Sequence, residues 1–136
     1  MPELLFVWYP RCSTCRKAKA WLDARGVAYV ERHIVDEPPT SDELAAWIAR
    51  SGLATRRFFN TSGKLYRELG VKAQLDAGLS DEGAIELLAS NGMLVKRPLL
   101  VGADFVLAGF REAEWAAALG EAAGAGTEAD AAGAAR

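Results

Sequence analysis

LLFVWYPRCSTCRK, residues 4–17, joins a short apolar run to a pair of cysteines and to the start of a helix. The run 4–9 is too short and too uniformly apolar for an amphipathic helix, and it fits a strand buried on both faces. From Ser13 onward the apolar residues follow a helical period. Cys12 and Cys15, the only cysteines, therefore lie at a strand-to-helix junction. In that context the Cys-x-x-Cys spacing indicates redox chemistry, although a metal site has to be considered as well.

The composition is that of one globular domain: 136 residues, 51% of them hydrophobic and 25% charged. A formal net charge of -2 gives no electrostatic reason to expect nucleic-acid or membrane binding. No apolar stretch is long enough to span a bilayer, and the first residues lack the basic start of a signal peptide. We therefore expect a cytoplasmic protein, a monomer, in a compartment where thiols are kept reduced. A close cysteine pair is then catalytic, regulatory or metal-binding.

The rest of the chain predicts alternating elements around a central helical region. The expected elements are a strand at 27–35, helices that begin after Thr40 and Ser80 and at 64–69, strands at 96–101 and 105–108, and a helix at 111–119. This order, β-α-β, helical insertion, β-β-α, predicts an α/β thioredoxin-like fold with a mixed four-stranded sheet. One domain covers 1–119, with the insertion at about 40–92. The Ala- and Gly-rich residues 120–136 have no periodic apolar face, which predicts a disordered tail.

Pro98 supports this fold. It stands at the start of a predicted strand. Proline has no amide hydrogen to donate to a neighbouring strand, so its presence there indicates a structural role. In thioredoxin-like folds this role is that of a cis proline that faces the cysteine motif. The sequence leaves the isomer of the Arg97–Pro98 bond open, because most such bonds are trans.

The two cysteines are expected to differ in reactivity. Cys12 lies at the first turn of the helix, where free amides and the helix dipole stabilise a thiolate and lower its pKa below about 8.5. Cys15 lies a turn further in and is more shielded. We therefore expect Cys12 to be the nucleophile and Cys15 the resolving thiol, with two unreactive cysteines on a basic helix start as the alternative. The residues expected to support this pair are Arg11, Ser13, Thr14, Arg16 and Pro98.

Arg97 is the third candidate catalytic residue. If Pro98 faces the cysteine loop, the Arg97 guanidinium lies close to Cys12 and can stabilise its thiolate or an anionic group carried on the sulfur. A surface arginine paired with a carboxylate is the alternative. Zinc would need two ligands beyond the cysteine pair, and the chain offers one histidine, His33, and no further cysteine. We expect no metal and no bound cofactor, and we expect His33 to be a hydrogen-bonded strand residue.

Several segments together resemble a known family. They are CSTCRKA at 12–18, PPTSDEL at 38–44, FFNTSGKLYRELG at 58–70 and NGMLVKRP at 91–98. The combination, over about 4–119, is similar to the arsenate reductase (ArsC)-related family and to its Spx/MgsR-like branch. The resemblance implies a thioredoxin-like fold with a helical insertion, thiol chemistry at Cys12, and an external thiol reductant such as glutathione, glutaredoxin or thioredoxin.

The two branches of the family imply different functions. In the arsenate reductases a cysteine attacks arsenate and three arginines hold the oxyanion. Cys12 and Arg97 match the nucleophile and one arginine, but Asn60 falls at the second arginine position. The third falls near 109–110, with Arg111 displaced from it. That branch also usually lacks the second cysteine, so the sequence weakens the arsenate interpretation.

In the Spx branch the cysteine pair is a redox switch, and the protein binds the carboxy-terminal domain of the RNA polymerase α subunit. Cys12, Cys15 and Arg97 match that branch, whereas 58–70 looks more like the enzyme-like relatives. Our first hypothesis is a thiol-disulfide redox protein. The alternatives are a redox-switch regulator that binds the polymerase α subunit and a glutathione- and glutaredoxin-dependent arsenate reductase.

Overall fold

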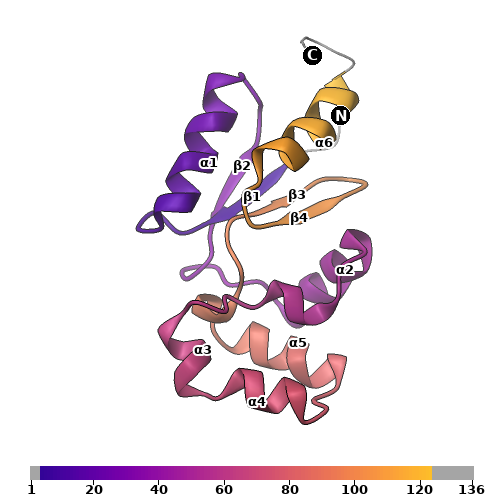
Figure 1. Ribbon diagram of the computed structural model, residues 1–136. Coiled ribbons are helices and arrows are strands. Elements are labelled where there is room, and N and C mark those ends of the chain that lie inside the picture. The colour runs from indigo at the N-terminus through magenta and orange to yellow at the C-terminus, as the bar shows by residue number, and fades with distance from the viewer. Residues whose placement is uncertain (1–3, 124–136) are drawn as a thin grey trace.

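A mixed four-stranded sheet lies at the centre of the computed structural model, which describes residues 4–123 (Figure 1). Its strand order is β2-β1-β3-β4. The central strand β1 (Leu5–Trp8) runs parallel to β2 (Val30–His33) and antiparallel to β3 (Leu99–Val101), and β3 forms a hairpin with β4 (Val106–Ala108). The sheet confirms the predicted α/β thioredoxin-like fold.

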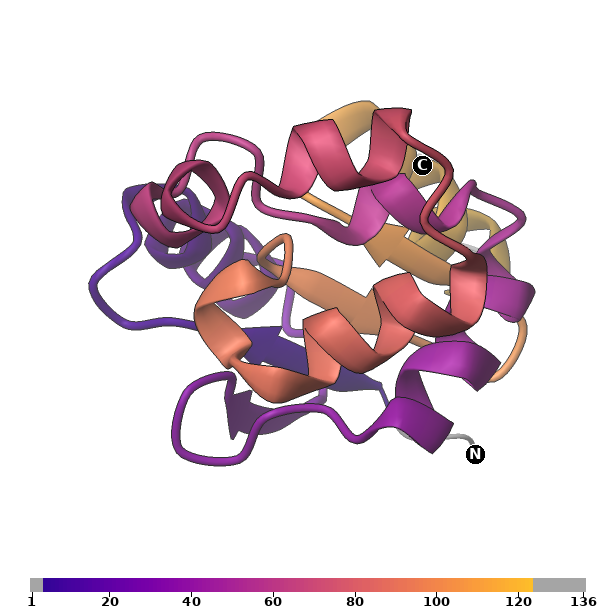
Figure 2. The same cartoon turned by 90° about the horizontal axis from the view of Figure 1, so that it is seen from below.

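Helices cover both faces of the sheet. On one face lie α1 (Ser13–Ala24) and α6 (Glu112–Ala123). The other face carries the helical insertion, seen from its own side in Figure 2. The insertion consists of α2 (Ser41–Ser51), the 3-10 turn η1 (Thr55–Phe58), α3 (Lys64–Glu68), α4 (Val71–Asp76), α5 (Asp81–Ser90) and the 3-10 turn η2 (Gly92–Leu94).

The strand β1 separates two hydrophobic cores. Phe6 packs with Leu100 and Trp115 on the α1/α6 face, whereas Val7 points to the insertion and packs with Ile34. All of these side chains are fully buried. Burial of each of these side chains contributes about 1.5–3 kcal/mol to stability. Because β1 is buried on both faces, its sequence is an uninterrupted apolar run.

Helix α2 begins after Thr40, as predicted, and its start forms a capping box. The Thr40 hydroxyl accepts a hydrogen bond from the Glu43 amide at 3.1 Å, and the Glu43 carboxylate accepts one from the Thr40 amide at 3.0 Å. The same carboxylate receives two hydrogen bonds from the Arg32 guanidinium, at 2.7 and 2.8 Å. This contact ties the start of the insertion to β2.

The structure corrects several predicted boundaries. The strands are shorter than expected, and β3 begins only at Leu99 because Pro98 has no amide hydrogen to donate. The amide of Lys96 instead donates to the Phe58 carbonyl at 2.7 Å, so this segment pairs with the insertion. Neither α4 nor the two 3-10 turns were predicted from the sequence.

The helix predicted at 111–119 ends later than expected. Helix α6 continues to Ala123, so the first residues of the expected tail are helical. The rest of that tail, 124–136, lies outside the described residues. None of the helices within 4–123 has the length and hydropathy that crossing a membrane requires.

Candidate active site

Cys12 occupies the N-cap position of α1, at the end of the loop that follows β1. Its amide donates to the Tyr9 carbonyl at 3.0 Å, and its carbonyl accepts the first helical hydrogen bond, from the Arg16 amide. The thiol makes no capping hydrogen bond. A thiolate at this place meets the positive end of the helix and its free amides.

The pKa of Cys12 is lower than that of an ordinary cysteine. Partial burial alone would raise this pKa, but the backbone amide and the thiol of Cys15, the positive charge of Arg97 and the amide of Thr14 together outweigh it. These groups all favour the charged sulfur. Cys12 is half-buried, which leaves its sulfur open to a reaction partner.

Cys15 has the opposite properties. Its side chain is completely buried, and this burial, together with the hydrogen bond and charge of the neighbouring Cys12 thiolate, raises the pKa of Cys15 to about 12. Both cysteines are present as free thiols. The pair therefore combines an accessible group that ionises readily with a shielded group that stays protonated.

Arg97 lies beside the cysteine pair, and its peptide bond to Pro98 is cis. The guanidinium lies over the Tyr9 ring, 5.3 Å from the ring centroid, and one of its nitrogens donates to the Met93 carbonyl at 3.4 Å. The Nε atom is buried without a hydrogen-bond partner among the described residues. No carboxylate pairs with Arg97 in this part of the chain, so its charge acts on the two sulfurs.

The residues predicted to support the cysteine pair differ in burial and in distance from the cleft. Pro98 is buried and Thr14 lies at the cleft described below. Arg16 donates to the Pro10 carbonyl at 2.9 Å and so closes the loop before the cysteines. Arg11 and Ser13 are exposed to solvent.

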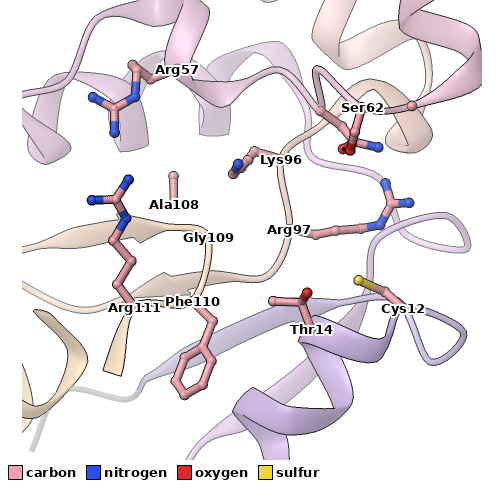
Figure 3. A pocket seen from close by; sticks show the side chains of 12 residues that line it. Cys12, Thr14, Arg57, Ser62, Lys96, Arg97, Ala108, Gly109, Phe110 and Arg111 are labelled. Carbon is pink, nitrogen blue, oxygen red and sulfur yellow. Dashed lines mark hydrogen bonds between the residues drawn. The ribbon is translucent and has the colours of Figure 1, made fainter. Parts of the chain in front are cut away.

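A cleft of about 470 Å³ opens beside Cys12 (Figure 3). Four cationic side chains line it, and no carboxylate is among its lining residues. These cations are Arg57, Lys96, Arg97 and Arg111. Arg57 and Lys96 were not predicted, since they come from irregular segments that only the tertiary fold brings to Cys12. The one available signal was the position of Lys96 next to Arg97.

The cleft contains the two positions at which the resemblance implied arginines that the sequence lacks. Asn60, at the second position, lines the cleft, as does Arg57 from η1. Gly109 lies near the third position and has a left-handed backbone, with φ of 80°. A Cβ atom there would be 2.9 Å from the Cε of Lys96, so the absence of a side chain at 109 leaves room for this lysine.

His33 does not belong to the cleft lining. Its Nδ1 accepts hydrogen bonds from the amides of Val35 and Asp36, at 3.2 and 3.1 Å, in the turn after β2. Across residues 4–123, no three His, Cys, Asp or Glu side chains come together as a metal site.

The amino-acid sequence also matches that of a known protein family. The model of the ArsC family matches residues 7–118. The chain belongs to the ArsC family. Within this family, it is 50% identical over 110 residues to the uncharacterized protein YusI of Bacillus subtilis, which covers 81% of this chain and 92% of YusI.

Two further proteins that the chain is similar to differ from each other in function. The global transcriptional regulator Spx of Streptococcus pyogenes is 33% identical over 105 residues, covering 77% of this chain and 76% of Spx. The solved structure of a possible arsenate reductase from Streptococcus mutans has a TM-score of 0.75 and 46% identity, covering 82% of this chain and 93% of that chain. One of these similar proteins is thus a transcriptional regulator and the other a possible enzyme.

Proposed function

We propose that the chain is a thiol-disulfide oxidoreductase in which Cys12 is the nucleophile and Cys15 the resolving thiol. The observation that supports this most directly is the contrast between the two thiols. Cys12 is accessible and its pKa is lowered, whereas Cys15 is buried and its pKa is raised. Two inert structural cysteines would not need such different environments.

The proposed reaction has two exchange steps. The Cys12 thiolate attacks one sulfur of a disulfide substrate, which forms a mixed disulfide with Cys12 and releases the other half of the substrate as a thiolate. Cys15 then gives up its proton to the released thiolate or to solvent and attacks the Cys12 sulfur, which forms the Cys12–Cys15 disulfide and releases the second half. The substrate is reduced by two electrons, and an external dithiol must return the protein to its reduced form.

A mixed-disulfide trap tests the proposed roles. In Cys15→Ser the second step is blocked, so a neutral disulfide such as hydroxyethyl disulfide is expected to leave a stable adduct on Cys12, visible by mass spectrometry. Cys12→Ser is the matched control, and it should form no adduct at neutral pH because Cys15 is buried. Adduct formation on Cys15 at a comparable rate would overturn the assignment of nucleophile and resolving thiol.

Arsenate reduction is the second candidate, and the cations of the cleft favour it. Asn60 and Gly109 stand where the resemblance to arsenate reductases would place arginines. Arg97, beside Cys12, and Lys96, its neighbour in the chain, nevertheless bring positive charge to the cleft. The activity predicts arsenate-dependent consumption of thiols, with glutathione and glutaredoxin supplied, that disappears in Cys12→Ser. No turnover at millimolar arsenate would exclude it.

A regulatory function is the third candidate, and the likeness to the Spx regulators favours it. The cysteine pair would then be a redox switch, and the partner would be the carboxy-terminal domain of the RNA polymerase α subunit. A pull-down with this domain, using the reduced and the oxidised protein in parallel, tests the idea. Absence of binding in both states would exclude it.

A further inference from the structure

We propose that the cationic cleft selects small disulfides whose ends away from the sulfur carry carboxylates. The inference rests on the proposed thiol-disulfide chemistry and names the class of substrate for it. It follows from how the four cations are distributed along the cleft and from what they contact.

The first observation is that the positive charge in the cleft is not neutralised by the protein. Among the ion pairs of residues 4–123, none includes Arg57 or Lys96, so no carboxylate lies within 4.0 Å of either. Arg111 has only a long contact of 3.9 Å with Glu114, and both side chains are more than half exposed. By contrast, the neighbouring Arg56 pairs with Asp76 at 3.1 Å. Cations that face a concave surface without partners attract anionic ligands.

The second observation is where these charges lie relative to the reactive sulfur. In Figure 3, Arg97 is beside Cys12, Arg57 and Arg111 lie toward the opposite end of the cleft, and Lys96 lies between them. A single small oxyanion on the sulfur would meet Arg97 and leave the far cations without a partner. A longer ligand can place its sulfur at Cys12 and its carboxylates near Arg57 and Arg111.

The third observation is the size of the cleft. Its volume of about 470 Å³ lies within the range of roughly 300–1,000 Å³ that small-molecule sites occupy. The lining also offers polar side chains between the charged ends, Thr14, Asn60 and Ser62, which can hydrogen-bond the amides of a peptide-like ligand. Glutathione disulfide has this chemistry and serves as the probe.

The experiment compares two disulfides that differ in charge and not in the groups around sulfur. The reduced protein is mixed with glutathione disulfide or with the disulfide of glutathione diethyl ester, and formation of the Cys12–Cys15 disulfide is followed by quenched mass spectrometry. Each rate is divided by the rate of the same disulfide with dithiothreitol, which removes differences in intrinsic reactivity. We expect the anionic disulfide to react about tenfold faster, and the advantage to shrink as salt is added.

Two variants and a matched control test which cations cause the difference in rate between the two disulfides. Arg57→Gln and Arg111→Gln should each reduce the anionic-to-ester rate ratio by about two- to fivefold, as expected for the loss of one exposed charge contact. Arg56→Gln changes the net charge equally but removes a cation that faces Asp76, and it should keep the ratio.

The outcomes separate this inference from the function on which it rests. Equal rates for the two disulfides, or an equal loss in Arg56→Gln and Arg57→Gln, would overturn the substrate class while leaving the thiol chemistry in place. If neither these disulfides nor hydroxyethyl disulfide oxidises the cysteine pair, the proposed function fails and the substrate class fails with it.

Discussion

One charged side chain, that of Arg97, acts on both thiols of the pair. It favours ionisation of Cys12 and of Cys15, but only Cys12 is accessible enough for its pKa to fall below the ordinary value. The Arg97 side chain can have this effect because no carboxylate of the described chain competes for it and part of it is buried.

Arg97→Gln should therefore raise the pKa of Cys12. The rate of alkylation of Cys12 by iodoacetamide, measured against pH, should move to higher pH because a positive charge that favours the thiolate has been lost. Lys17→Gln removes the same charge from an exposed position of α1 and is the control, with a smaller shift expected. An unchanged profile in Arg97→Gln would show that the amides at the start of α1 suffice to lower the pKa.

Glu43 stabilises the start of α2, because it takes part both in the capping box with Thr40 and in the ion pair with Arg32. The hydrogen bonds from Arg32, followed by the backbone and side-chain contacts with Thr40, lower the pKa of Glu43 to about 2 although partial burial opposes this. In the unfolded chain the pKa of a glutamate is about 4.3. The stabilisation from Glu43 is therefore complete above that value and is lost as the pH falls through about 4 toward 2.

Glu43→Gln should lower the free energy of unfolding by about 1 kcal/mol at pH 7, a modest value because the side chain is about a third exposed. Urea unfolding at pH 7 and at pH 3 measures this, and the difference from the wild type should shrink at the lower pH. Glu68→Gln, which affects only the exposed pair with Lys64, is the control and should have little effect at either pH.

The turn η2 fits closely against the end of β2 because residue 92 is a glycine. A Cβ atom at Gly92 would lie 2.0 Å from the Ile34 carbonyl oxygen, which belongs to the backbone and cannot rotate away. Gly92→Ala should cost about 1–3 kcal/mol of stability, the usual range for overpacking. Thermal unfolding measures this cost.

Gly120→Ala is the matched control. Nothing lies within 4 Å of a Cβ at Gly120, which is in α6, so the substitution should be neutral or stabilising by up to about 1 kcal/mol. Equal effects of the two substitutions would mean that η2 can move away from β2 without cost. Since η2 leads directly to Arg97, such freedom would also affect the site.

Trp115 connects the hydrophobic core on the α1/α6 face of the sheet to the cleft. Its indole is fully buried and donates to the Gly109 carbonyl at 3.0 Å, which fixes the turn that lines the cleft. The same ring packs edge to face against Phe6, Trp21 and Phe110.

Trp115→Phe should lower the free energy of unfolding by about 1–3 kcal/mol, because it leaves the Gly109 carbonyl without its partner and opens a small cavity. Trp21→Phe is the control: this ring is half-buried and makes no hydrogen bond in the described chain, so a smaller loss is expected. Denaturant unfolding of both variants measures the difference. Equal losses would mean that the hydrogen bond to Gly109 contributes nothing.

Much of the fold could be predicted because the deciding signals are local. The apolar run that became β1, the helical period after Ser13, and the Thr40 capping box depend on near neighbours in the chain. The boundaries of β3 and α6 were less predictable. The first depends on the pairing of Lys96 with Phe58, and the second on a helix that continues through Gly120 without a sequence signal to mark its end.

The amino-acid sequence was sufficient to place the two cysteines at the start of α1, because the strand, the cysteines and the helix lie within one continuous segment. Which charges surround the cysteines depends on the tertiary structure. Arg57 and Arg111 are far from Cys12 in the chain, and they reach its cleft only after the insertion and the β3–β4 hairpin have packed around it. Charges act through space, so no pattern along the chain can show where they meet.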